Sequence, residues 1–370
     1  MKRVLIALSL GVSLLLAACG GSSGATNPST GAPAVVVPTP PAAQLTGAGA
    51  TFPQPFYDAA RFAYNKKFSQ VTVNYQGVGS GGGINQLTKK IVDFGASDVP
   101  LKASEAAAMG GSDKVVQIAS TLGTVSMAYN LDGVADGALK LTPDTIAGIF
   151  LGKITKWNDS ALAADNSGVN LPNQDIRVVH RSDGSGTTYI FTDYLSNVSP
   201  DWKAKTGGPG KSISWPVGDG AQGNAGVATR VTQTPGAIGY VELAYVLQTK
   251  MKQAALKNHD GTFVIPSAAG ATAAANAFAG TTPSNFSIVN AAGKDSAPIS
   301  GYSWIIVYKD QAEKTKGTAL VDYLYWLTTA DGQQYAVNLH YAALPSSMAS
   351  YDLTTLKGVT FGGSALLSVS

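Results

Sequence analysis

A tight turn between a strand and a helix lies in the middle of this chain and limits what it can fold into. Residues 175–195 (DIRVVHRSDGSGTTYIFTDYL) predict a strand over 176–180, a loop over 181–186 and a helix that opens at Thr187. Glycines in this loop let the backbone turn sharply and approach a ligand closely. The first amides of the helix have no intrahelical partner, and Arg181 adds a positive charge, so the loop suits a tetrahedral oxyanion. An ordinary helix cap is the alternative interpretation.

A second loop of this character lies near the start of the globular sequence. Residues 45–50 predict a short strand, and a turn at Thr51 and Phe52 leads into a helix through residue 67 with apolar residues at helical spacing. The Thr51 hydroxyl suits either a cap for this helix or a contact with a ligand.

The third loop follows a strand over 71–75 and precedes a helix over 84–91. Its glycines Gly77, Gly79 and Gly82 match the G-x-G-x-x-G spacing of dinucleotide-binding turns. That alternative is disfavoured because the strand is not the first of its domain, and because the run GSGGG holds more glycines than the fingerprint needs. We therefore interpret this loop as a cradle for an anion, with Ser80 at its centre.

Asp98 follows a further glycine turn and would place a carboxylate beside that anion. An ionised carboxylate only accepts hydrogen bonds, so it repels an anion unless the anion carries a proton to donate. If the loops converge, Asp98 selects a protonated oxyanion. The alternative is a helix cap or a turn residue, since Asp98-Val99-Pro100 is a favourable turn sequence.

The first 18 residues are typical of a bacterial lipoprotein signal peptide. Lys2 and Arg3 precede an apolar run over 4–16 that is too short for a comfortable membrane span, and the run ends in LAAC. Cys19 is the only cysteine of the chain, and lipidation of its sulfur explains a lone cysteine in an exported protein. We expect a signal peptide over 1–18 and a flexible lipid-anchored tether over 19–43, because that uncharged segment cannot form a core.

Charge and histidine content restrict the remaining function classes. Removal of Lys2 and Arg3 leaves 24 of the 26 basic residues against 23 acidic ones, so the mature chain has no general attraction for nucleic acid or membrane surfaces. The three histidines have no metal-ligand spacing, and we expect no metal and no cofactor. Residues 205–212 (KTGGPGKS) end like a phosphate-binding P-loop, but Lys205 stands where that pattern requires glycine, so we predict a surface loop.

Five motifs then occur in one order between about residues 45 and 345. They are TGAGATFPQPFY, NYQGVGSGGG, DFGASDVPL, HRSDGSGTTYIFTDYL and PGAIGYVELAY. Together they resemble the phosphate-binding proteins of bacterial high-affinity phosphate ABC transporters. The resemblance implies an α/β, two-lobed periplasmic-binding-protein fold of type II. Each lobe would be a mixed sheet flanked by helices, with the ligand in the cleft between the lobes.

The same resemblance implies a set of phosphate-binding residues, and the sequence has the expected residue type at each position: Thr51, Phe52 (through its backbone amide), Ser80, Asp98, Arg181, Ser185, Gly186 and Thr187. Asp183 matches a supporting aspartate that pairs with the binding arginine. Gly81 replaces a second serine and His180 replaces a basic residue, and neither belongs to the ligand set. The glycine-rich loop 218–226 (GDGAQGNAG) is a candidate fourth ligand loop by its chemistry. The resemblance gives it no contact, so we leave it outside the predicted site.

The resemblance also implies how the chain is divided and used. Lobe I would comprise residues 44–124 and 302–370, and lobe II residues 125–301. The implied function is capture of hydrogen phosphate or dihydrogen phosphate outside the cytoplasmic membrane, by lobes that close on a hinge, and delivery to the permease of a phosphate ABC transporter. We expect a monomer in the periplasm or cell envelope, held at a membrane by its lipid anchor.

Two other functions fit parts of the sequence. A hydrolase could combine Ser185, His180 and Asp183, but Arg181 would compete for the aspartate, and the histidine lies on the strand before the turn. A sulfate or molybdate binder would face an unpaired carboxylate, because those anions carry no proton at neutral pH. We therefore predict a phosphate-binding protein without enzyme activity.

Overall fold

The computed structural model describes residues 38–278 and 280–369, which belong to one compact unit. The predicted signal peptide, Cys19 and the predicted tether up to residue 37 lie outside the described residues. Strand β1 (Ala43–Gly49) begins at the last residue assigned to the tether, so the first strand starts slightly earlier than predicted. Within the described ranges, no helix is both long and apolar enough to cross a membrane.

A mixed sheet of nine strands runs through this unit in the order β2-β1-β3-β12-β4-β8-β6-β7, and β9 also pairs with β4. β1 is parallel to β2 and β3, β12 and β4 are antiparallel, and β6 is parallel to β7 and β8. The strands are β1, β2 (Val71–Gly77), β3 (Phe94–Ser97), β4 (Val115–Tyr129), β6 (Arg177–Arg181), β7 (Asp219–Ala221), β8 (Ala237–Glu242), β9 (Lys252–Gln253) and β12 (Ser300–Tyr308). Smaller sheets are formed by β5 (Lys140–Leu141), β10 (Ala255–Lys257) and β11 (Phe263–Val264), and by β13 (Thr360–Phe361) with β14 (Ser364–Ala365).

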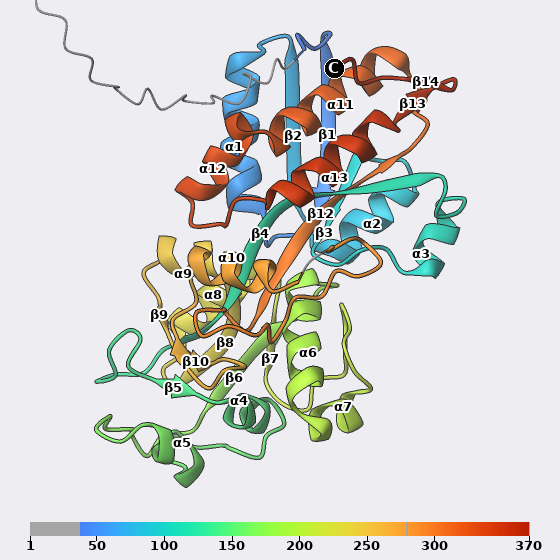
Figure 1. The fold of residues 1–370 in the computed structure, drawn as a ribbon. Coiled ribbons are helices and arrows are strands. Elements are labelled where there is room, and N and C mark those ends of the chain that lie inside the picture. Colours follow the sequence, from blue (N-terminus) through green and yellow to red (C-terminus); the bar gives the residue numbers. More distant parts are fainter. Residues whose placement is uncertain (1–37, 279, 370) are drawn as a thin grey trace, which may run out of the picture. The chain divides into compact units, whose positions relative to one another are not determined.

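Strand β4 connects the two halves of the large sheet. It pairs with β12 up to Thr124 and with β8 from Val125 onward. Figure 1 shows β4 and β12 running between two groups of helices, one around β1 and β2 and the other around β6 and β8. We propose that this change of partner separates lobe I (44–124 and 302–370) from lobe II (125–301), and the two names are used in this sense below.

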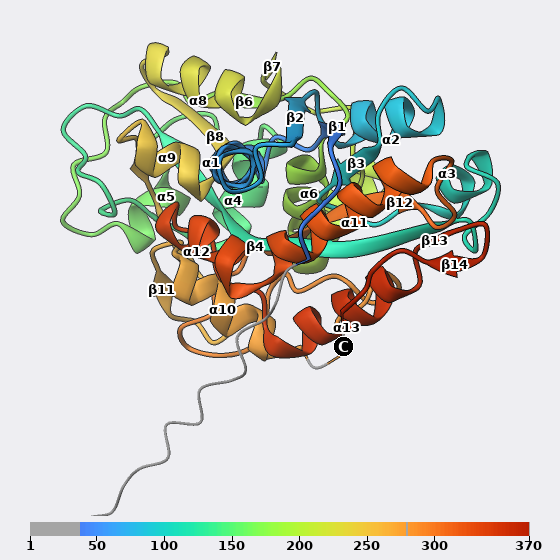
Figure 2. The same cartoon turned by 90° about the horizontal axis from the view of Figure 1, so that it is seen from above.

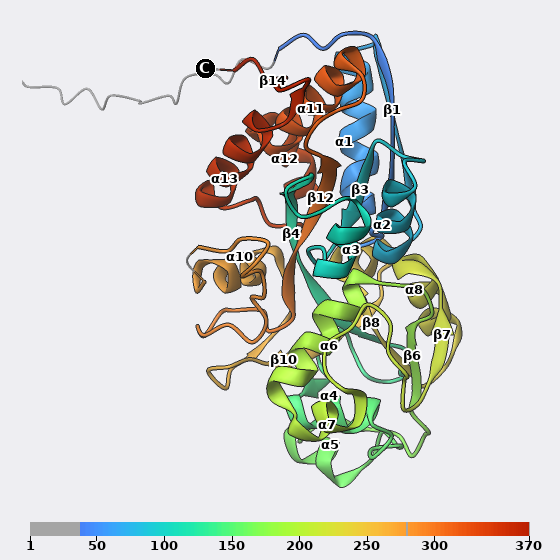
Figure 3. The same cartoon turned by 90° about the vertical axis from the view of Figure 1, so that its right-hand side faces the viewer.

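Helices flank the sheet in both lobes. Lobe I carries α1 (Gln54–Lys67), α2 (Ser80–Thr88), α3 (Ala103–Ala108), α11 (Lys314–Thr328), α12 (Ala330–Asn338) and α13 (Ser346–Lys357). Lobe II carries α4 (Pro143–Phe150), α5 (Ser160–Asp165), α6 (Gly186–Val198), α7 (Pro200–Thr206), α8 (Gly223–Gln233), α9 (Leu243–Gln248) and α10 (Ala268–Asn276). Figure 2 places α8 and α13 on opposite sides of β4, and Figure 3 shows α10 on the side of α13 and α8 on the side of α2. The predicted α/β architecture, with a mixed sheet flanked by helices, is confirmed.

Aromatic side chains anchor α1 to the rest of lobe I. Tyr57 meets Tyr75 edge-on with ring centroids 4.9 Å apart, and Tyr64 packs against Trp326 at 5.1 Å. Burial of each ring removes a large apolar area from water, and this stabilises a chain whose single cysteine cannot form an internal disulfide. The packing holds the N-terminal end of α1 in place, and Thr51 lies immediately before it.

Candidate anion-binding site

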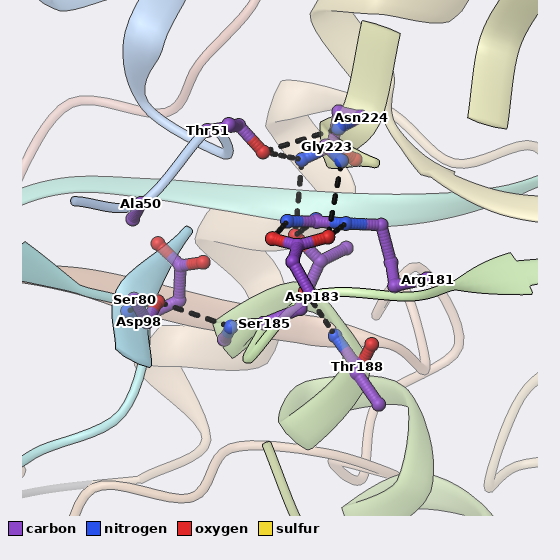
Figure 4. Close-up of polar contacts among 12 residues, drawn as sticks. Ala50, Thr51, Ser80, Asp98, Arg181, Asp183, Ser185, Thr188, Gly223 and Asn224 are labelled. Atoms are coloured by element: carbon purple, nitrogen blue, oxygen red, sulfur yellow. Dashed lines mark hydrogen bonds and ion pairs between the residues drawn. The ribbon is translucent and has the colours of Figure 1, made fainter. Parts of the chain in front are cut away.

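Three loops meet where a strand ends and a helix begins (Figure 4). β1 leads through Thr51 into α1, β2 leads through Gly79 into α2, and β6 leads through Asp183 into α6. Helix α2 begins at Ser80, not at the predicted residue 84, because Gly79 adopts a φ of 84° that favours glycine and completes the turn directly before the helix. Ser80 therefore lies in the first turn of α2, where free amides and the helix dipole attract anions.

Arg181 and Asp183 form a buried ion pair at the end of β6. Arg181 Nε donates to Asp183 Oδ1 at 2.7 Å and Nη2 donates to Oδ2 at 2.5 Å, while the arginine is only 3% exposed. Burial acts to raise the pKa of Asp183, but the hydrogen bonds and charge of Arg181 outweigh it and hold that pKa below its ordinary value. Arg181 Nη1 donates to Thr187 Oγ1 at 3.3 Å. Three of the five guanidinium N–H groups are thus engaged within the described residues, and two remain for an anion.

Asp98 contributes a carboxyl from lobe I, directly after β3, and is 2% exposed. Its Oδ1 accepts a hydrogen bond from Ser303 Oγ at 2.6 Å, and its amide donates to Ser80 Oγ at 3.2 Å. Burial raises the pKa of Asp98 to about 7, although the hydrogen bond from Ser303 and the charge of Arg181 act to lower it. The carboxyl can therefore exchange a proton near neutral pH and meet a ligand either as an acceptor or as a donor.

Gly186 brings the start of α6 against lobe I. Its amide donates to Ser80 Oγ at 3.0 Å. A Cβ added at this glycine would lie 2.5 Å from Asp98 Cβ and 2.6 Å from Ser80 Oγ. A backbone hydrogen bond from Gly81 N to Gly184 O, 2.8 Å long, also joins the lobes. Any side chain at position 186 would force these surfaces apart, because they are in direct contact.

The sequence left a helix cap as the alternative role for the loop before α6 and for Thr51, and the structure gives opposite answers for the two. Ser185 does cap α6, since its Oγ accepts from Thr188 N at 3.0 Å. Thr51 does not cap α1, because Pro53 occupies the N-cap position and makes no side-chain cap. The Thr51 hydroxyl instead accepts hydrogen bonds from the amide and the side chain of Asn224 in lobe II, at 3.1 Å and 3.0 Å.

The predicted site residues come together at this boundary between the lobes. Thr51 and Ser80 are hydrogen-bonded across it, Asp98 contacts Ser80, and Arg181, Ser185 and Gly186 belong to the single loop that faces them. Phe52 is buried; its carbonyl accepts from Tyr341 OH at 2.7 Å, and its amide, the predicted ligand, donates to no acceptor among the residues described. Binding of a ligand by these residues stays a prediction.

Sequence reasoning missed three groups that complete the network. Asn224 lies in the glycine-rich loop 218–226, whose composition was the signal that could have revealed it. Ser303 lies in the middle of β12, and no local pattern marks it. The hydroxyl of Tyr240, on β8, accepts a hydrogen bond from Arg181 N at 2.9 Å and lies 2.6 Å from Thr188 Oγ1, so it holds both ends of the loop between β6 and α6.

The hydrolase alternative fails on geometry. Asp183 binds Arg181, and His180 Nδ1 lies 3.0 Å from the carbonyl oxygen of Arg181. The imidazole ring stacks on Trp215 with centroids 4.7 Å apart, and Ser185 Oγ serves the helix cap. The three residues therefore do not form a nucleophile, base and orienting acid. In the part of the chain that the structure describes, no cluster of His, Cys, Asp or Glu could hold a metal ion.

The loop at 205–212 is not the plain surface loop that its sequence predicts. Lys211 is buried and forms an ion pair with Glu105 of α3, so the loop joins lobe II to lobe I at the edge of the site. Burial lowers the pKa of Lys211, and the partner carboxylate opposes that shift. The error arose because the P-loop pattern compares residues within the loop alone and carries no information about a partner in the other lobe.

Replacement of Glu105 by glutamine is expected to weaken ligand binding by about three- to tenfold, because a partly buried ion pair that joins the lobes favours their closure. Glutamine keeps an oxygen for the Lys102 amide, which donates to Glu105 at 2.9 Å, so α3 should stay capped. Titration calorimetry measures the effect. The matched control is Asp201→Asn, since Asp201 pairs with Lys153 inside lobe II. Equal affinities for the two variants would contradict the role in closure.

Comparisons with known proteins agree with this geometry. A family model described as a PBP superfamily domain matches residues 35–331. The phosphate-binding protein PstS of Xylella fastidiosa (strain 9a5c) is 44% identical over 318 residues, which cover 84% of this chain and 85% of the relative. The chain belongs to the PstS family of phosphate-binding proteins. PstS of Pasteurella multocida (strain Pm70) is likewise 44% identical, over 84% of this chain and 89% of its own.

A solved structure shows the same fold as this PstS family member. The crystal structure of the phosphate binding protein from Stenotrophomonas maltophilia matches with a TM-score of 0.64 and 22% identity, over 84% of this chain and 93% of that one. The family resemblance inferred from the five motifs and the predicted two-lobed fold are both confirmed. The PstS family is a family of binding proteins, and neither the family model nor these relatives are named as enzymes.

Proposed function

We propose that this protein binds inorganic phosphate between its two lobes and delivers it to the permease of a phosphate ABC transporter. The observation that carries the proposal is the convergence of a buried cation, Arg181, and a buried carboxyl, Asp98, whose pKa is raised to about 7. Arg181 attracts any oxyanion, whereas an ionised Asp98 accepts a hydrogen bond only from an anion that still carries a proton. Phosphate is such an anion at neutral pH, and membership of the PstS family supports the same ligand.

We assign the binding groups by chemical type. Arg181 supplies charge and two N–H donors, and Asp98 supplies the acceptor for the phosphate proton. The remaining donors are hydroxyls and amides near helix starts: the hydroxyls of Thr51, Ser80, Ser185 and Thr187, and the amides of Phe52 and Thr187. The Gly186 amide, which donates to Ser80 Oγ in this structure, would exchange that bond for one to the anion. Asp183 does not touch the ligand and holds Arg181 in place. Such a site dehydrates the anion and replaces its water by fixed donors.

The donors come from both lobes, so binding requires the lobes to close. Thr51 and Ser80 belong to lobe I, and Arg181 and Gly186 belong to lobe II, so one anion meets all of them only when the lobes are in contact. Tyr245 OH of lobe II adds a 2.6 Å hydrogen bond to Thr51 O of lobe I. Phosphate therefore stabilises the closed arrangement and shifts the population toward it.

The cellular setting is inferred from the sequence before residue 44. We propose that the protein acts outside the cytoplasmic membrane, in the periplasm or cell envelope, as a monomer anchored through lipid on Cys19. It would function as a binding protein, not an enzyme, and without a cofactor. Its near-neutral mature charge argues against nucleic acid as a partner.

Calorimetric titration of the chain from residue 19 onward, freed of bound ligand, tests the proposal. We expect one phosphate to bind per chain and sulfate to release no heat at pH 8, because sulfate offers no proton to an ionised Asp98. Comparable sulfate binding would place the Asp98 carboxyl away from the ligand. Absence of binding for both anions would contradict the proposed function itself.

A further inference from the structure

Asn224 is a buried polar residue outside the predicted ligand set, and its side-chain amide and backbone N–H bind residues of the site or of its support. It lies in the first turn of α8 and is 0% exposed. Its side-chain oxygen accepts from Glu242 N at 3.0 Å. Because a backbone amide only donates, this contact fixes which end of the Asn224 amide is oxygen and which is nitrogen.

The nitrogen end of Asn224 connects two threonines of the proposed site. Asn224 Nδ2 donates to Thr51 Oγ1 in lobe I and to Thr187 Oγ1 in lobe II, both at 3.0 Å. The Asn224 backbone amide donates to Thr51 Oγ1 as well, at 3.1 Å, as Figure 4 shows. One side chain therefore joins hydroxyls that come from opposite sides of the boundary between the lobes.

A count of hydrogens shows what these bonds impose on the two hydroxyls. A threonine hydroxyl has two lone pairs and one hydrogen. Thr51 Oγ1 accepts twice from Asn224, and Thr187 Oγ1 accepts once from Asn224 and once from Arg181 Nη1. Both lone pairs of each oxygen are thus occupied. The hydrogen of each hydroxyl can only be donated to a further acceptor.

We propose that Asn224 is a positioning residue for phosphate: it orients the Thr51 and Thr187 hydroxyls as hydrogen-bond donors to the anion and couples this orientation to contact between the lobes. The inference rests on the proposed phosphate function. Anion oxygens accept hydrogen bonds, so hydroxyls fixed as donors need no reorientation when phosphate arrives. Asn224 acts through the threonines and need not touch the ligand.

A double-mutant cycle tests this role. Asn224→Ala is expected to raise the phosphate Kd about tenfold or more, the order of one lost hydrogen bond to a charged group. In a background with Thr51→Val and Thr187→Val, the same change should alter the Kd by less than about twofold, because the hydroxyls it orients are gone. A merely structural role would give the same factor in both backgrounds and would overturn the proposal.

Asn166 provides the matched control, because it is a buried asparagine with a complete network elsewhere in lobe II. Its oxygen accepts from Lys140 N at 2.7 Å, and its nitrogen donates to Lys140 O and Leu162 O. Asn166→Ala should lower the unfolding temperature without a coupled change in phosphate affinity. A fall in affinity that equals that of Asn224→Ala would contradict a specific role of Asn224.

Neutron diffraction of the wild-type phosphate complex gives a second test that depends on no variant. We expect deuterium on Thr51 Oγ1 and Thr187 Oγ1 to point at phosphate oxygens, and deuterium directed at Asn224 would overturn the inference. Failure of the wild-type protein to bind phosphate would remove the proposed function and this inference together. If the wild-type protein bound phosphate and Asn224→Ala changed the Kd by the same factor in both backgrounds of the double-mutant cycle, only this inference would be contradicted.

Discussion

Replacement of Arg181 by alanine is expected to weaken phosphate binding between about 30-fold and several thousand-fold, since loss of one partner of a buried charge pair costs about 2–5 kcal/mol. The variant removes the cation that faces the anion. It also leaves Asp183 without its hydrogen bonds from Nε and Nη2 and with the Gly223 amide as its remaining donor, so the negative charge of a carboxylate near the ligand loses its partner cation. Sulfate and arsenate should lose affinity together with phosphate, because the arginine does not discriminate among oxyanions.

Arg177 supplies the control for this experiment. It lies on the same strand, β6, but its side chain is 63% exposed and its contact with Asp175 is 3.7 Å long. Arg177→Ala should leave the phosphate Kd within about twofold of wild type. Arg181→Lys should fall between wild type and alanine, because an ammonium keeps the charge but cannot reproduce the two parallel bonds to Asp183. A folded Arg181→Ala variant with normal affinity would contradict the proposed site.

The parts of the site that the sequence predicted are those set by local chemistry. The predicted strand over 176–180, the glycines in the turn and the helix, which was predicted from Thr187 and begins at Gly186, are neighbours in the chain, so their local spacing indicates an anion loop. The start of α4 depends on local chemistry in the same way: Thr142 caps the helix and Pro143 occupies its first position. The start of α2 was placed four residues too late, because glycines weaken the helical pattern.

The parts that the sequence could not predict depend on distant segments. Asn224 meets Thr51 across 173 positions of sequence, and Ser303 reaches Asp98 across 205. Lys211 and Glu105 are 106 positions apart in the sequence, and their ion pair can be recognised only in the folded structure. Local spacing carries no information on such contacts, and hydroxyl or amide side chains are common enough in loops that no composition singles them out. The family resemblance implied a set of ligand residues but none of the distant residues that contact them.

Asp98 is expected to control discrimination between phosphate and sulfate, and its environment gives that discrimination a pH dependence. Burial raises the pKa of Asp98 to about 7. Above this pH the carboxyl is mainly ionised and can only accept, so it favours hydrogen phosphate, which has one O–H, and repels sulfate, which has none. Below it the carboxyl carries a proton and can donate to either anion. Sulfate affinity of the wild-type protein should therefore increase as the pH falls from 8 to 5, and the phosphate preference should decrease.

Asp98→Asn removes this dependence. The asparagine amide is neutral, offers both a donor and an acceptor, and does not titrate. We expect sulfate affinity to rise by about a hundredfold at pH 8, because a like charge facing a bound anion costs several kcal/mol. The ratio of phosphate to sulfate Kd values, measured by competitive titration at several pH values, should become nearly flat. The amide can still accept from Ser303, so the position should remain well packed.

Asp193 distinguishes this effect from the mere removal of a buried charge. Like Asp98, it accepts a 2.6 Å hydrogen bond from a serine hydroxyl, that of Ser287, and burial raises its pKa, but it lies within α6, beyond the first turn and outside the three loops, and it shares with Asp98 only the lining of a small pocket. Asp193→Asn should leave the selectivity and its pH profile unchanged. If Asp98→Asn kept the wild-type preference at every pH, the carboxyl would not face the ligand. Selectivity would then have to come from the hydroxyls and amides alone, which donate equally well to both anions.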